Sequence, residues 1–269
     1  MTLDAAHRHA RLMMDDPDMD TPLLRRIGAH IDIDDDCREY IRTLQSEPMV
    51  FGPGADIIQA DAEASRIYVV QYGWLYGYSF TSSGQRFVHR IYQPGDFVAI
   101  EDINWNYRSS NVSSVTACVV TAFDKPTLRR IFEESPRLAR TIFSIVAMTQ
   151  VQTYDLARSV SRLPAEARLA DFLLQLHARG RVAGTLHHED EFHLPLTQSQ
   201  IGDAIGLTNV SVSRAFTALE RAGLLKRSGR MIRFRERDKL VEMADFIDRH
   251  DAVDRDWIEA DPPERRAFA

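Results

Sequence analysis

Hydrogen-bonding side chains gather at the start of a predicted helix that runs from Asn209 to Leu219. Val212, Phe216 and Leu219 recur at helical spacing and mark the face that is expected to be buried. The residues left largely off that face are Asn209, Val210, Ser211, Ser213 and Arg214. In a helix-turn-helix, side chains at this position face the DNA major groove and can bond to base edges.

A shorter helix that begins after Thr197 is expected to position this group. Ile201 and Ile205 lie one turn apart and share a face, and Gly202 between them allows a close helix approach. Gly206 is suited to ending the first helix, and Thr208 to capping the second. The alternative is a helical hairpin that only packs.

A basic hairpin follows, from Lys226 to Phe234, with a Ser228-Gly229 turn. Between Arg214 and Lys239, nine Lys or Arg residues face three acidic ones, a local net charge of +6, although the whole chain carries −6. Neutralising phosphates requires such local charge. A solvated surface is the alternative, but it would mix the two signs more evenly. The segment therefore predicts a wing that contacts DNA.

Composition limits the class of protein. The 269 residues suffice for two domains, and 44% hydrophobic with 27% charged residues is typical of a globular protein. Apolar runs are too short to span a membrane, and residues 1–20 lack the apolar stretch of a secretory signal. Cys37 and Cys118 cannot form a disulfide framework or a four-thiolate site, which favours a cytoplasmic protein.

The predicted fold class is α+β. Segments rich in Val, Ile, Tyr and Phe alternate with turns between about Pro48 and Phe123, which indicates an antiparallel β-barrel or jelly roll. A helix from Pro136 to about Arg162 follows. Its apolar stripe fits either a dimer helix or packing on its own barrel, and consists of Leu138, Ile142, Ile145, Thr149, Gln152 and Leu156.

These elements predict five regions. Residues 1–20 form a flexible tail, 21–135 the β-barrel domain, 136–162 the long helix, 163–249 the winged helix-turn-helix domain and 250–269 a second tail, which Val253, Trp257 and Ile258 could anchor in part. His7 and His9 are interpreted as residues of the solvated tail, because no metal-binding partner is evident. His187 and His188 are interpreted as loop residues, because adjacent histidines are poorly placed to bind one metal. We expect no metal.

The order of these elements resembles the Crp/Fnr family of bacterial transcription regulators. The resemblance covers residues 21–245 and includes the Pro94-Gly95-Asp96-Phe97 turn and the helix-turn-helix with Gly206, Val212 and Arg214. It implies a homodimer joined along the long helix, bound to a pseudo-palindromic site in double-stranded DNA, with RNA polymerase as a further partner.

The resemblance also implies roles for single residues. Asn209, Val210, Ser213 and Arg214 match the base-reading positions. The expected phosphate or sugar contacts are Gln198, Ser199, Thr208 and Ser211, together with Lys226, Arg227 and Arg230 of the wing. Many members carry Glu where Val210 stands. Val210 cannot accept a hydrogen bond but can touch a thymine methyl, so we expect a changed half-site.

An effector pocket is less clearly indicated. Cyclic-nucleotide-binding relatives use a Gly-Glu pair after Pro-Gly-Asp-Phe and a later Arg-Ser pair. Arg108-Ser109 matches the second pair, but Glu101 is displaced by one residue and the glycine is missing. Cyclic AMP control is therefore not the leading expectation, and ligand-independent action or another small molecule is favoured. An iron–sulfur cluster would need four thiolates. His89 is a haem-ligand candidate by position, but a lone histidine on a strand is more often a structural residue.

Two further function classes remain open. The chain could be a small-molecule sensor whose winged domain contacts proteins, or an enzyme on a barrel fold. The sequence contains no recognisable nucleophile–base pair, metal triad or phosphate-binding loop, so an enzyme is not expected.

Overall fold

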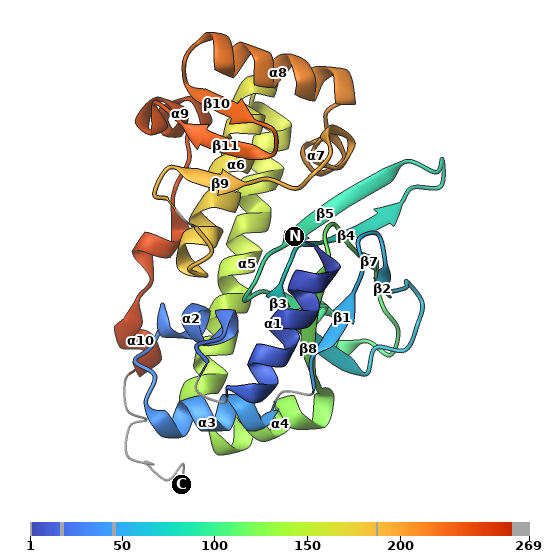
Figure 1. Ribbon diagram of the computed structural model, residues 1–269, viewed down its shortest axis with the longest axis vertical. Coiled ribbons are helices and arrows are strands. Elements are labelled where there is room, and N and C mark those ends of the chain that lie inside the picture. The colour runs from blue at the N-terminus through green and yellow to red at the C-terminus, as the bar shows by residue number, and fades with distance from the viewer. Residues whose placement is uncertain (1, 17–18, 45–46, 187, 260–269) are drawn as a thin grey trace, which may run out of the picture.

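The computed structural model describes residues 2–16, 19–44, 47–186 and 188–259. A β-sheet domain with its flanking helices and a winged helix domain are joined by one long helix (Figure 1). Among the described helices, none combines the length and apolar character that a membrane crossing requires.

Two four-stranded antiparallel sheets form the first domain. The strands are β1 (Met49–Phe51), β2 (Asp56–Ile58), β3 (Arg66–Tyr72), β4 (Leu75–Phe80), β5 (Arg86–Tyr92), β6 (Phe97–Val98), β7 (Asn111–Ser114) and β8 (Cys118–Asp124). Their orders are β1-β8-β3-β6 and β2-β7-β4-β5. Val70, Leu75, Val98 and Val112 contribute to a core between the sheets. The predicted α+β class is confirmed, and the sheets form a jelly roll rather than a closed barrel.

The predicted flexible tail over residues 1–20 is wrong for most of its length. Helix α1 (Leu3–Asp15) packs on β1 and β8, and Ala6 and Ala10 are buried against Val119. Small side chains let the helix approach the sheet closely, although its other residues are mostly polar. Helices α2 (Pro22–Gly28) and α3 (Asp35–Leu44) follow.

The long helix has the predicted bounds. After α4 (Lys125–Glu134), helix α5 runs from Pro136 to Arg162. Leu138, Ile142 and Ile145 are buried in the core of the helix's own domain. They therefore cannot serve as a dimer seam, and that part of the stripe is explained by the second interpretation.

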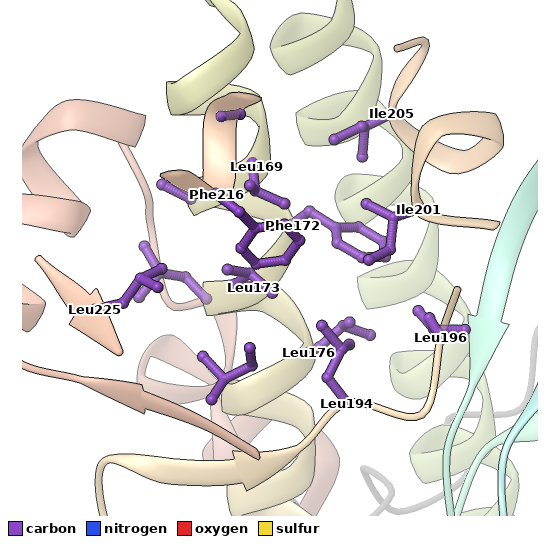
Figure 2. Close-up of a cluster of buried hydrophobic side chains, with 14 of the residues drawn as sticks. Leu169, Phe172, Leu173, Leu176, Leu194, Leu196, Ile201, Ile205, Phe216 and Leu225 are labelled. Carbon is purple, nitrogen blue, oxygen red and sulfur yellow. The ribbon is translucent and has the colours of Figure 1, made fainter. Parts of the chain in front are cut away.

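The winged domain follows directly. It contains α6 (Ala165–Val182), β9 (Glu191–His193), α7 (Gln198–Ile205), α8 (Asn209–Arg221), β10 (Leu225–Ser228), β11 (Met231–Phe234) and α9 (Arg237–Ala244). Figure 2 shows Leu169, Phe172 and Leu173 of α6 in one cluster with Ile201 of α7 and Phe216 of α8. Helix α6 ends at Val182 and β9 begins at Glu191, and of the residues between them His187 lies outside the described residues.

A buried ionic cluster joins the two domains. Asp96, in the Pro-Gly-Asp-Phe turn, is fully buried and forms ion pairs with Arg26 of α2 and Arg179 of α6. Arg90 of β5 lies 3.9 Å away. Since these groups come from four separate elements, the turn fixes the winged domain against the first domain.

A C-terminal strap, residues 245–259, returns from the winged domain to the first domain. It includes η2 (Arg249–Ala252) and α10 (Arg255–Glu259). Arg249 pairs with Asp155 of α5 at 2.8 Å, and Arg140 donates to the Ile258 carbonyl at 2.8 Å. Ile258 is fully buried and Val253 packs against the same core, as expected of anchoring residues, whereas Trp257 is half exposed. Residues 250–259 are therefore not a free tail. Residues 260–269 lie outside the described residues.

Candidate nucleic-acid interface

Local capping sets the position of α7. Thr197 and Gln200 form a reciprocal capping box, with the Gln200 amide 3.2 Å from the Thr197 hydroxyl and the Thr197 amide 2.9 Å from the Gln200 side-chain oxygen. Gly206 ends the helix in the left-handed conformation with φ of 67°. These caps fix both ends of the first helix of the motif, as the sequence predicts.

Helix α8 presents a polar N-terminal surface. Thr208 caps it by accepting from the Ser211 amide at 3.1 Å. Asn209, Val210 and Arg214 are exposed, with 59% of Val210 accessible. Within the described part of the chain, no hydrogen bond or ion pair engages the Arg214 guanidinium. Three of the four side chains predicted to read bases are therefore available to a ligand.

The remaining predicted contacts surround this surface. Ser213 is half-buried, as are Gln198 and Ser211, whereas Ser199 and Thr208 are exposed. The Thr208 and Ser211 hydroxyls lie 2.9 Å apart. They cap the helix and form one edge of the exposed surface at the same time.

The wing is a three-stranded sheet of order β10-β11-β9, in which β9 was not predicted. Lys226 and Arg230 are exposed. Arg227 instead pairs with Glu220 at 2.6 Å and lies over the Phe216 ring, 4.4 Å from its centroid. It thus ties β10 to α8, whereas within the described residues no ion pair engages Lys226 or Arg230.

The predicted effector residues do not join into one hydrogen-bonded group. Asp102, which the sequence did not single out, accepts from the Ser109 hydroxyl at 2.6 Å and lies 3.7 Å from the Arg108 guanidinium. Arg108 is buried. Glu101 instead accepts from the Tyr92 hydroxyl at 3.3 Å. Glu101 lies in a short 3-10 helix (Ile100–Asn104), which begins after Ala99 turns the chain in the left-handed conformation.

The two cysteines and the candidate haem ligand are not grouped either. Burial raises the pKa of Cys118 to about 12, which keeps its thiol protonated and unreactive. Burial also raises the pKa of Cys37 and lowers that of His89. Among the described residues, no three His, Cys, Asp or Glu side chains are arranged to hold a metal ion.

Two family models match this architecture. Residues 48–135 match the cyclic nucleotide-binding domain, and residues 167–243 match the Crp-like helix-turn-helix domain. Together they account for the jelly roll and the winged motif, in the order that the family has. The chain belongs to the Crp/Fnr family of transcription regulators.

Known relatives agree with this assignment. The fumarate and nitrate reduction regulatory protein of Escherichia coli is 25% identical over 191 residues, which cover 71% of this chain and 76% of that protein. The transcriptional regulatory protein btr of Bordetella pertussis is 28% identical over 201 residues, covering 72% and 80%. The structure of FixK2 from Bradyrhizobium japonicum is similar with a TM-score of 0.66 and 25% identity, covering 74% and 96%.

One glycine decides how the two helices of this Crp/Fnr motif meet. A Cβ atom at Gly202 would lie 2.4 Å from the Leu207 carbonyl oxygen. We expect Gly202→Ala to lower the free energy of unfolding by about 1–3 kcal/mol. The direction of this change is informative, because alanine forms helices better than glycine by about 1 kcal/mol and would otherwise stabilise the protein. Urea unfolding measures the change.

The matched control for this variant is Gly52→Ala. No heavy atom lies within 4 Å of a Cβ built at Gly52. The control should leave stability nearly unchanged, whereas a neutral Gly202→Ala would show that the turn at Leu207 has room to move.

Proposed function

We propose that this regulator binds a pseudo-palindromic DNA site as a homodimer and acts without cyclic AMP control. The exposed N-terminal surface of α8 beside two free wing cations, Lys226 and Arg230, carries this proposal. Such an arrangement combines groups that can specify bases with groups that neutralise phosphates.

The side chains suggest which bases are read. Arg214 can donate two hydrogen bonds to a guanine edge, and Asn209 can pair in a bidentate manner with an adenine. Val210 offers only an apolar contact, which suits a thymine methyl. We therefore propose a half-site that differs from one read by a glutamate at this position.

The exposed face of α5 supports the homodimer. Phe143, Val146 and Tyr154 are 58%, 37% and 62% exposed, and they recur at three- and eight-residue steps along one side. Gln150, which lies between Val146 and Tyr154, and Ala157, which follows Tyr154, are exposed on the same side. Together the five residues repeat about every 3.5 positions, as a two-stranded coiled-coil interface requires. This stripe replaces the buried one that the sequence indicated.

The contacts of the effector residues support independence from cyclic AMP. Arg108 and Ser109 are engaged by Asp102, and Glu101 pairs with Tyr92, so the groups expected to hold phosphate and ribose have other partners. Calorimetry with cyclic AMP should show no saturable heat. Binding that Arg108→Ala abolishes would contradict this part of the proposal. By family analogy we also propose RNA polymerase as a partner and the cytoplasm as the location.

Salt dependence tests DNA binding itself. The affinity for a duplex selected with this protein should fall steeply between 50 and 200 mM salt, because about 0.9 counterions are released per neutralised phosphate. The double variant Lys226→Ala/Arg230→Ala should flatten the slope by about one per removed cation. Duplex binding that is absent or insensitive to salt would favour the second candidate, a sensor whose winged domain contacts proteins.

Recognition of the DNA sequence is expected to depend on Arg214. Arg214→Ala should weaken binding to the selected duplex by about 1–3 kcal/mol and relax the preference at one base pair per half-site. Arg221→Ala, at the exposed far end of α8, is the matched control and should leave base preference intact. Measuring affinity across single-base variants of the duplex separates the two. A uniform loss for Arg214→Ala would identify it as a phosphate contact.

A further inference from the structure

A cavity of about 460 Å³ lies between the first domain and the wing. His9 of α1, Tyr72 of β3 and Trp74 line one side, and Phe192 and His193 of β9 line the other. Cavities that hold compounds of one or two rings are of this order. Neither Glu101 nor the Arg108-Ser109 pair contributes to its wall, so it is distinct from the predicted effector pocket.

Two hydrogen-bond acceptors in the wall are unused. His9 bonds to the backbone of Gln71 through one ring nitrogen, while its Nε2 is buried and has no partner within the described part of the chain. The side-chain amide of Gln93 donates to the Leu176 carbonyl at 3.1 Å, but its Oε1 is likewise buried and unpartnered. Protein atoms cover both acceptors, and unpaired buried acceptors are costly, so a rotation of either side chain toward the cavity would be favoured by a ligand that supplies donors.

Aromatic rings form the apolar part of the wall. The His9 and Tyr72 rings lie 5.1 Å apart, and Trp74 and Phe192 complete an aromatic lining. Rings of this kind favour offset or edge contacts with another planar ring. The shape and chemistry of the wall therefore suit an aromatic compound.

The cavity also disfavours a charged ligand. Burial lowers the pKa of His9 and of His193, so both imidazoles are neutral near pH 7. At the rim, Arg25 is engaged by two backbone oxygens and a neighbouring carboxylate, and Glu191 forms an ion pair with Arg233. Since the surrounding charges are paired or absent, a net charge on the ligand would gain little.

We propose that this cavity is a binding site for an uncharged aromatic compound that donates hydrogen bonds to His9 and Gln93. Such a ligand touches the first domain on one side and β9 on the other. Because β9 pairs with β11, whose turn carries Arg230, occupancy would bias the position of the wing. The binding site is independent of DNA recognition, whereas this regulatory consequence rests on the proposed function.

Trp74 provides the signal for a test. The chain has three tryptophans, and Trp105→Phe with Trp257→Phe leaves Trp74 as the only one. In this background, 4-hydroxyacetophenone should quench the fluorescence in a saturable manner. Acetophenone, which has the same ring but no donor, should bind about tenfold more weakly, as expected for one lost hydrogen bond.

Paired variants on α1 locate the contact. His9→Phe keeps a ring beside Tyr72 but removes Nε2, and should weaken 4-hydroxyacetophenone about tenfold while leaving acetophenone unchanged. His7→Phe, exposed on the same helix, should change neither. No saturable quenching, or equal affinity of the two probes for the unmodified site, would overturn the proposal without requiring any variant to fold.

Duplex titrations with and without 4-hydroxyacetophenone complete the test. A changed DNA affinity at saturation supports coupling to the wing. Probe binding to a protein that does not bind any duplex would refute the proposed function and leave the site standing. Duplex binding by a protein that ignores the probe would refute the site alone.

Discussion

Replacing Asp96 with asparagine is expected to lower the free energy of unfolding by about 3–5 kcal/mol, the cost of breaking a buried ion pair from one side. Burial by itself would raise the pKa of Asp96, but Arg179, Arg26 and Arg90 outweigh it and hold the pKa well below its usual range. The carboxylate is therefore ionised, and a neutral amide would leave buried guanidinium groups without a counter-charge.

The control for this variant is a half-exposed ion pair between the same two domains. Arg86 of β5 and Asp203 of α7 lie 2.7 Å apart, with side chains 29% and 26% exposed. Asp203→Asn should cost no more than about 1 kcal/mol, as surface pairs do. Urea unfolding of both variants gives the comparison, and equal losses would mean that the Asp96 cluster contributes only as a surface pair does.

A second large effect is expected from pH. Burial, together with nearby Arg26, lowers the pKa of both His30 and His250 to about 4. Each folded-state pKa lies below the unfolded value of about 6.5, so the unfolded chain binds protons first as the pH falls. Stability is thus fully present above pH 6.5 and is lost toward pH 4. Each histidine should contribute a loss of about 2 kcal/mol by pH 5.

The double variant His30→Leu/His250→Leu isolates this effect. Between pH 7 and pH 5 it should lose about 4 kcal/mol less than the unmodified protein. His7→Gln, at an exposed position, should follow the unmodified protein. Asp96 does not affect the comparison between pH 7 and pH 5. Because its pKa is depressed, its contribution to the free energy of unfolding is kept until the pH falls below about 4. Parallel curves for all three proteins would rule out the two histidines.

Local signals in the sequence were enough to predict the DNA-binding motif. Gly206 and Thr208 each require one backbone conformation, and both adopt it. Pro136 likewise begins α5, and Pro164 marks the start of α6. These features depend on a few neighbouring residues, so contacts with the rest of the fold are not needed to predict them.

Features that depend on distant partners could not be predicted in this way. The buried face of helix α1 consists of alanines. Because alanine is only weakly hydrophobic, this face could not be recognised in the sequence among the charged residues around it. The stripe of Leu138, Ile142 and Ile145 was correctly seen as apolar, but periodicity cannot say which surface covers it. The contacts of Asp102 with Arg108 and Ser109 could not be predicted, because a turn of the chain brings the three residues together and no regular spacing in the sequence marks it.

The C-terminal strap has a consequence for the order in which the protein can fold as it is made. Ile258 belongs to the core of the first domain, and Arg255 donates to the Ala29 carbonyl across 226 positions of sequence. A ribosome must therefore synthesise the entire winged domain before the first domain can close. Until then an apolar hollow beside α5 stays open to water, so the nascent chain offers chaperones a binding surface that the finished regulator no longer has.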